Sequence, residues 1–152
     1  MSDGEIYTKH AEELTRFATG LVGPGQASDV VSTAVLRCLA SKRWSRVTDK
    51  RAYLFRCVYN EAARLHRRNS RRLWREQRTA VDDVVDPPEV RPEVLSAVMS
   101  LSPRQRAVIV LTYWDDLDPS SIARLLNISD GSVRRHLNRA RTRLKEVLNA
   151  EY

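Results

Sequence analysis

The sequence predicts an all-α protein of two small helical domains joined by a linker, and three observations lead to this prediction. Apolar side chains recur at three- and four-residue spacing in both halves of the chain, as they do along one face of a helix. No stretch shows the sustained alternation of a β-strand. An acidic segment with three prolines within residues 87–92 separates the halves. We therefore expect domains at residues 1–76 and 93–152 and a flexible linker at residues 77–92.

The first domain is expected to hold helices at residues 6–21, 27–40 and 50–76. The middle one has the clearest pattern, because apolar residues follow one face at helical spacing: Ala27, Val30, Val31, Ala34, Val35 and Cys38. Gly23-Pro24-Gly25 breaks the chain before it, and Ser28 is the expected cap.

A row of arginines follows one face of the third expected helix. Its members are three or four residues apart: Arg56, Asn60, Arg64, Arg67, Arg71 and Arg75, with Arg68 and Arg72 beside them. Arginines this close repel one another, and a phosphate backbone would relieve that repulsion. A nucleic-acid surface is therefore favoured over a merely solvated face. Trp44, which precedes the helix among cations, could stack an unpaired base or pack under a loop.

Charge is distributed unevenly along the 152 residues, whose net charge is +7. Residues 1–76 hold 15 Lys/Arg against 8 Asp/Glu, and residues 101–152 hold 9 against 6. Residues 77–100 reverse the balance, with 2 against 5. Two basic modules are thus separated by an acidic linker, whose roughly 16 residues could reach about 50 Å. Such modules could bind distant parts of one polyanion.

The second domain carries the helix start and stop signals of a helix-turn-helix. Ser102-Pro103 and Asp118-Pro119 each pair a capping residue with proline at the first helical position. Asn127-Ile128 is the expected turn, and Ser129 is the expected cap of the last helix. Residues 131–145 of that helix hold six cations and no acid. Its first turns, which a recognition helix inserts into the major groove, contain Ser132, Arg134, Arg135 and Asn138.

The sequence lacks the residue patterns that are typical of several classes of protein. No apolar run approaches the roughly 20 residues that span a bilayer, and the acidic start does not resemble a signal peptide, so a cytoplasmic protein without membrane insertion is expected. The two cysteines, Cys38 and Cys57, are expected to be small buried thiols. Neither they nor the three histidines have metal-ligand spacing, so no metal or cofactor is assigned. No paired carboxylates, phosphate loop or nucleophile–base arrangement indicates an enzyme.

Residues 101–117, which read Leu-Ser-Pro-Arg-Gln-Arg-Ala-Val-Ile-Val-Leu-Thr-Tyr-Trp-Asp-Asp-Leu, resemble the start of region 4 in extracytoplasmic-function (ECF) sigma factors of bacterial RNA polymerase. Residues 122–129 and 131–141 are similar to the rest of that region. Residues 27–34 resemble a helix of region 2, and residues 52–61 with the arginines that follow resemble the region 2 helix that reads the −10 element, especially in actinobacterial members. The resemblance covers nearly the whole chain.

The resemblance implies a non-enzymatic sigma factor whose partners are core RNA polymerase, promoter DNA and an anti-sigma factor. Region 4 would bind the −35 element through Ser132, Arg134, Arg135, Asn138 and Arg139. Region 2 would bind the −10 element through Trp44, Arg56, Asn60, Arg64, Arg67, Arg68 and Arg71. The polymerase would contact the outer face of the second helix at Asp29, Ser32, Thr33, Leu36 and Arg37.

One alternative lies within DNA binding: a stand-alone helix-turn-helix regulator that binds duplex promoters without polymerase. Another class, an interaction protein that mimics DNA to sequester sigma partners, would need an acidic face. This chain is basic, which disfavours that reading.

Overall fold

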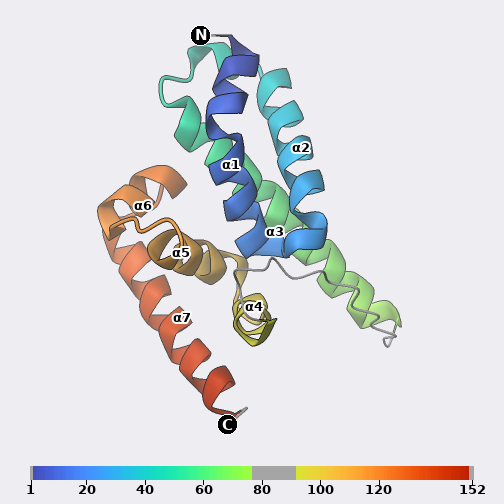
Figure 1. The fold of residues 1–152 in the computed structure, drawn as a ribbon, viewed down its shortest axis with the longest axis vertical. Helices are drawn as coiled ribbons and strands as arrows, with labels where there is room; N and C mark the ends of the chain where they lie inside the picture. Colours follow the sequence, from blue (N-terminus) through green and yellow to red (C-terminus); the bar gives the residue numbers. More distant parts are fainter. Residues whose placement is uncertain (1, 77–91, 151–152) are drawn as a thin grey trace.

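The computed structural model describes residues 2–76 and 92–150, and side chains within residues 2–70 and 93–149. The first module (residues 2–76) holds α1 (Asp3–Val22), α2 (Pro24–Ala40), the short 3₁₀ turn η1 (Trp44–Arg46) and α3 (Lys50–Glu76). The second module (residues 92–150) holds α4 (Pro92–Met99), α5 (Pro103–Tyr113), α6 (Pro119–Leu126) and α7 (Asp130–Ala150). These parts of the chain contain no strand, which confirms the predicted all-α class (Figure 1).

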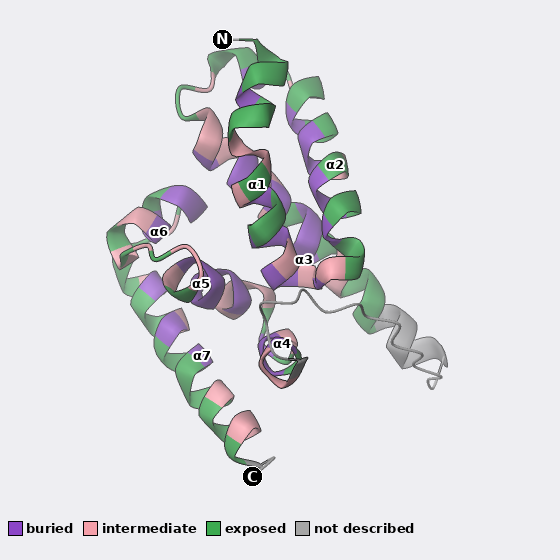
Figure 2. Ribbon diagram, viewed as in Figure 1, coloured by how far each residue is buried: buried purple, intermediate pink, exposed green. Residues whose placement is uncertain are grey.

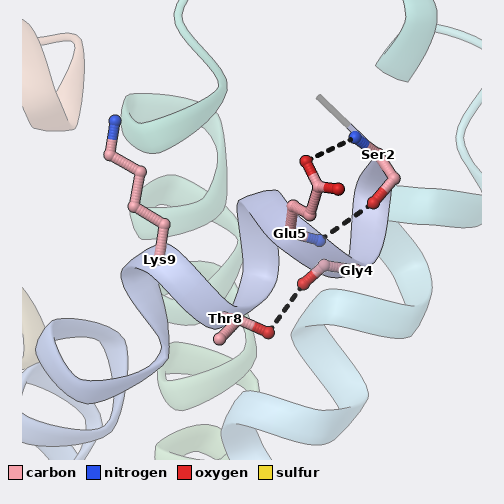
Figure 3. A pocket seen from close by; sticks show the side chains of 5 residues that line it. All are labelled: Ser2, Gly4, Glu5, Thr8 and Lys9. Atoms are coloured by element: carbon pink, nitrogen blue, oxygen red, sulfur yellow. Dashed lines mark hydrogen bonds between the residues drawn. The ribbon is translucent and has the colours of Figure 1, made fainter.

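Helix α1 begins three residues earlier than the apolar pattern predicted, because a capping box sets its start. The Ser2 hydroxyl accepts a bond from the Glu5 amide at 3.2 Å, and the Glu5 carboxylate accepts one from the Ser2 amide at 3.4 Å. Figure 3 shows these bonds beside a surface recess, where the Thr8 hydroxyl also donates to the Gly4 carbonyl. The polar side chains at this recess therefore form hydrogen bonds with backbone groups of α1 itself.

The start of α2 differs from the prediction. Gly23 adopts a left-handed φ of +85°, and its amide donates to the Thr19 carbonyl at 2.9 Å, which ends α1. Pro24, whose ring presets a helical φ, then begins α2 at once. Ser28, the expected cap, is therefore an exposed residue inside the helix.

The core of the first module lies among α1, α2 and α3. Phe17 of α1 and Phe55 of α3 are fully buried, with ring centroids 5.0 Å apart. Cys38 is buried and Cys57 half-buried, and both are free thiols, largely as predicted. A hydrogen bond between the two thiols raises the pKa of Cys38 and lowers that of Cys57.

The helices of the second module begin at the predicted capping residues. The hydroxyl of Ser102 and the carboxylate of Asp118 cap α5 and α6, and each accepts from the amide three residues on. That backbone bond lowers the pKa of Asp118. Asn127 ends α6 with a left-handed φ of 57°, and Ser129 accepts from the Ser132 amide at 3.0 Å to cap α7. These bonds confirm the predicted helix-turn-helix.

The two modules pack against each other. Helix α5 lies against α1, and α6 lies against α3 (Figure 1). Buried residues of both modules form one continuous apolar cluster. Figure 2 shows burial on the inward faces and exposure along the outer sides of α2 and α7.

Candidate nucleic-acid interfaces and polymerase surface

Helix α7 divides sharply into an inner and an outer face. Val133, Leu137 and Ala140 are buried against the rest of the second module. The outer face holds four exposed residues of the predicted −35 set: Arg134, Arg135, Asn138 and Arg139. Ser132 is half-buried in the first turn, where its amide completes the cap. The structure thus brings the predicted set together at the start of α7.

The start of α7 is held in place and is strongly positive. The Ser120 hydroxyl of α6 donates to the Asp130 carboxylate at 2.9 Å, which ties the two helices of the motif together. Burial lowers the pKa of His136, and the charges of Arg104, Arg135 and Arg139 lower it further. These surroundings disfavour a proton on His136 and favour an anion such as a phosphate nearby.

The arginine row of α3 is only partly directed at solvent. Asn60, Arg64, Arg67 and Arg68 are exposed, whereas Arg56 is half-buried. The side chain of Arg71 lies outside the described residues. The predicted row is therefore present on one face as far as it is described.

Glu61 is an acid beside this row, and its burial and its pairing with three arginines were not predicted from the sequence. Its side chain is buried, and its carboxylate lies 3.4 Å from Arg64, 3.9 Å from Arg68 and 3.6 Å from Arg37 of α2. The spacing of Glu61 and Arg64, three residues apart on one helix, was the available signal. Glu61 thus links α3 to Arg37 of α2, and two arginines of the row share the same carboxylate.

Trp44 does not take the position expected of a base-stacking residue. It is buried in η1, where its indole N–H donates to Asp3 at 2.9 Å. The Lys50 ammonium lies 4.6 Å from its ring centroid, and the Tyr53 ring lies 6.1 Å away. The prediction that Trp44 stacks a base is therefore wrong for this structure, because packing against these groups covers the ring.

The predicted polymerase surface is one face of α2. Asp29, Ser32, Leu36 and Arg37 are exposed and Thr33 is half-buried. Leu36 is 69% exposed, the most exposed large apolar side chain among the described residues. Helix α2 packs on α1, α3 and η1, so the second module leaves this face open.

Neither a metal-binding cluster nor a membrane-spanning helix is found among the described residues. No three His, Cys, Asp or Glu side chains gather there to hold a metal ion. No helix in the same ranges is both long and apolar enough to cross a membrane.

Comparisons with known proteins agree with this geometry. Residues 6–72 match the family described as sigma-70 region 2, and residues 91–144 match sigma-70 region 4. The RNA polymerase sigma-E factor of Streptomyces antibioticus is 34% identical over 95% of this chain and 83% of its own length. That of Streptomyces coelicolor is 34% identical over 96% of this chain and 85% of its own length.

Two solved structures share the fold. The sigma factor RpoE in complex with the anti-sigma factor NepR, from Bartonella quintana, has a TM-score of 0.73, 20% identity and coverage of 98% of both chains. CnrH in complex with the cytosolic domain of CnrY has a TM-score of 0.63, 25% identity and coverage of 99% of this chain and 89% of CnrH. The chain belongs to the sigma-70 family and, within it, to the ECF sigma factors of RNA polymerase, the proteins that direct transcription initiation.

Proposed function

We propose that this sigma factor divides promoter recognition between two helices, with α7 on the −35 element and α3 on the −10 element, while α2 binds core polymerase. The observation that carries the proposal is the two-faced character of α7. Buried Val133, Leu137 and Ala140 hold the helix in place, so that its outer arginines and Asn138 are presented together.

The −35 chemistry follows from the outer face of α7. An arginine can donate two hydrogen bonds to guanine, and an asparagine can pair with adenine. Arg134 and Arg135 lie in the first turns, the part of a recognition helix that reaches base edges. Arg139 lies one turn further on and, with Ser132, completes the proposed site.

The −10 site is the exposed row of α3. Asn60 and Arg64 are the proposed base contacts. Arg67, Arg68 and Arg71 follow on the same side as proposed phosphate contacts, and Arg56 supports the start of the row. A helix of 27 residues rises about 40 Å, which is enough to follow one strand over several nucleotides.

The polymerase site is the open face of α2, formed by Asp29, Ser32, Thr33, Leu36 and Arg37. Protein interfaces combine an apolar core with a polar rim. The exposed Leu36, surrounded by these polar residues, has that arrangement on a small scale. Replacing Asp29 and Leu36 together by Ala should weaken binding to core polymerase in a titration. Replacing Lys9 and Glu12, which are exposed on α1, should leave that affinity unchanged.

We further infer that the protein acts in the cytoplasm by binding alone and that an anti-sigma factor controls it. The two solved proteins of the same fold were both captured in complexes, one with the anti-sigma factor NepR and one with CnrY. A pull-down with candidate anti-sigma domains from the same genome would test this part.

The decisive experiment is run-off transcription with purified core polymerase on genomic fragments. The chain should confer initiation at specific promoters, and duplex binding by the free chain should be weak by comparison. Tight sequence-specific binding by the free chain, with no association with core polymerase, would instead identify a stand-alone regulator.

A further inference from the structure

Two thiols lie in the interior of the first module, and the proposed promoter recognition uses neither of them. Cys38 belongs to α2 and Cys57 to α3, they are the chain's only cysteines, and both are free. Cys38 is fully buried, whereas Cys57 is half-buried at the edge of the core. The two thiols therefore differ in their access to solvent, and only Cys57 can meet a dissolved molecule directly.

The thiols lie in the middle of a row of contacts between α2 and α3, which pack against each other (Figure 1). On α3 the row contains Tyr53, Cys57 and Glu61, which are four residues apart and so share one helix face. The Tyr53 hydroxyl donates to the Ser41 hydroxyl at the end of α2 at 3.2 Å. The Glu61 carboxylate lies 3.6 Å from the Arg37 guanidinium of α2. These contacts on either side hold the helices in a register that keeps the two thiols opposite each other.

This register suits a covalent bond between the two sulfurs, which are already joined by a hydrogen bond. Helices pack with their axes about 8–10 Å apart, and Cα atoms lie about 2.3 Å from each axis, so facing Cα atoms are roughly 4–6 Å apart. A disulfide spans Cα atoms that are about 4.4–6.8 Å apart. The bond can therefore form while α2 and α3 remain packed as they are.

The surroundings make the two thiols chemically unequal. A hydrogen bond from the Cys38 thiol lowers the pKa of Cys57; burial opposes this effect, and the charge of the neighbouring Arg56 supports it. The same hydrogen bond raises the pKa of Cys38, and burial raises it further. Thiolates are the nucleophilic form, and reactive cysteines are typically partly exposed and close to cations. Cys57 thus has the surroundings of an attacking thiol, and Cys38 those of a thiol that keeps its proton.

We propose that Cys57 is an oxidation site for hydroperoxides and that Cys38 then closes a reversible disulfide between α2 and α3. Three features support this site: the contacts that keep the thiols opposite each other, the unequal access of the two thiols, and the cation beside Cys57. The site is independent of how the chain recognises promoters.

The oxidation proceeds in two steps. The Cys57 thiolate attacks one oxygen of the hydroperoxide, the O–O bond breaks, and the leaving oxygen takes a proton to become an alcohol or water. Cys57 then carries a sulfenic acid. The Cys38 sulfur attacks the Cys57 sulfur, the S–O bond breaks, and the proton of the Cys38 thiol leaves with the hydroxide as water. The hydroperoxide has gained the two electrons that the thiols have lost.

The disulfide is transient where thiols are kept reduced, as in the cytoplasm in which we infer that the chain acts. A dithiol attacks one sulfur of the bond and restores both thiols by exchange. While the bond lasts, it closes a loop of about 20 residues and restricts the unfolded chain, so it stabilises the first module. Oxidation by this route therefore preserves the fold that positions the outer faces of α2 and α3.

The first test oxidises the whole chain with hydrogen peroxide and maps the product with trypsin. Trypsin cuts after lysine and arginine, so the expected product is one pair of peptides, with residues 38–42 joined to residues 57–64. Dithiothreitol should return both peptides to their free forms. The oxidised chain should unfold at a temperature roughly 5–10 °C above that of the reduced chain.

Two matched variants separate the roles of the two thiols. In Cys38→Ala, peroxide should leave a sulfenic acid on Cys57, which dimedone traps, and no disulfide should form. In Cys57→Ala, the buried Cys38 should be oxidised at least roughly tenfold more slowly than Cys57 is in the wild type. Circular dichroism establishes whether each variant keeps native helix content. If either variant unfolds, alkylation of the native wild-type chain with iodoacetamide gives the same comparison, since Cys57 should be labelled before Cys38.

Several results would overturn the proposal. One is a wild-type chain that keeps both thiols in peroxide, or whose thiols pair only after urea unfolds it, since the native helices would then not present the pair. Another is a disulfide between two chains, seen as a dimer on a non-reducing gel. A third is equal reactivity of the remaining thiol in Cys38→Ala and Cys57→Ala, or equal labelling of both thiols in the wild type. The two cysteines would then be ordinary packing residues.

Discussion

Helices α3 and α7 each carry a row of arginines on one face, but their surroundings differ. On α3, Arg64 and Arg68 share the buried carboxylate of Glu61 with Arg37 of α2. On α7, no acidic partner of Arg134, Arg135 or Arg139 is found among the described side chains, and their neighbourhood is positive enough to lower the pKa of His136. These three arginines of α7 therefore have no ion pair among the described side chains that would compete with an outside anion, whereas two arginines of the row on α3 share a carboxylate within the fold.

The comparison shows why a charge pattern alone is ambiguous. In both helices the spacing predicted a nucleic-acid surface, and a solvated face was the competing interpretation. On α3, the buried carboxylate of Glu61 pairs with two of the arginines, Arg64 and Arg68, in the absence of DNA. The predictions that follow use this difference.

The largest effect is expected on α7. Replacing Arg134 or Arg135 by Ala should cost about 1–3 kcal/mol of binding at the −35 element if each makes a bidentate base contact. The loss should depend on the identity of one base pair. Competition binding of the polymerase holoenzyme to a set of −35 variants measures it. An equal loss on every sequence would make the residue a phosphate contact.

The next largest effect is expected on the stability of the first module. Glu61→Gln should lower the free energy of unfolding by about 1–2 kcal/mol, because three guanidinium groups lose their shared carboxylate. The expected loss is small because water screens these arginines, whose side chains are 54%, 46% and 66% exposed. Urea denaturation measures the change, and Glu12→Gln on the exposed side of α1 is the control. Unchanged stability would mean that the Glu61 contacts contribute nothing.

A smaller effect distinguishes arginines within the α3 row. Arg67→Gln should reduce the slope of log affinity against log salt by about 0.7–0.9, the value for one lost phosphate contact. Arg68→Gln should reduce the slope by less, because Glu61 already neutralises part of the charge that Arg68 could offer to a phosphate. Salt titrations of holoenzyme binding would compare the two. Equal slopes would show that Glu61 does not compete with DNA.

The smallest effect is a pH dependence of the packing between the two modules, in which α5 and α6 lie against α1 and α3. Burial lowers the pKa of His66 in this packing, and the charges of Arg106 and Arg67 lower it further. A His66 released from the packing would have a pKa near the ordinary 6.5 and would bind a proton first as the pH falls. The packing should therefore be fully stable above about pH 7 and weaken below 6.5. Scattering between pH 8 and 5.5 should show expansion on acidification, and His66→Gln should reduce it. Identical profiles for the two proteins would exclude His66.

Local signals in the sequence predicted much of the fold. The caps at Ser102, Asp118 and Ser129 and the turn at Asn127 were all found, because each depends on bonds between residues close in the chain. The limits of α3 were predicted correctly for the same reason. Ser28 failed as a cap because Gly23 and Pro24 supplied a competing local signal four residues earlier.

Features that depend on distant residues were not predictable. Trp44 is buried, and its indole N–H donates a hydrogen bond to Asp3, 41 residues earlier in the chain. Arg106 donates a hydrogen bond to the Leu21 carbonyl, which is 85 residues away in the chain and 2.8 Å away in space. The outer residues of α2 and α7 could be predicted because an apolar stripe on one face of a helix fixes what the opposite face exposes.

The most direct test of the account separates recruitment from strand opening on one promoter. Holoenzyme made with the wild-type chain, Arg135→Ala or Asn60→Ala is bound to the promoter, and bound DNA and permanganate-reactive thymines are measured on the same complexes. Arg135→Ala should reduce the bound DNA and leave the opened fraction of bound complexes unchanged, because α7 acts on the duplex −35 element. Asn60→Ala should leave recruitment nearly unchanged and reduce the opened fraction. If both variants reduce the same step, or if Asn60→Ala opens DNA normally, the division of promoter recognition between α7 and α3 is contradicted.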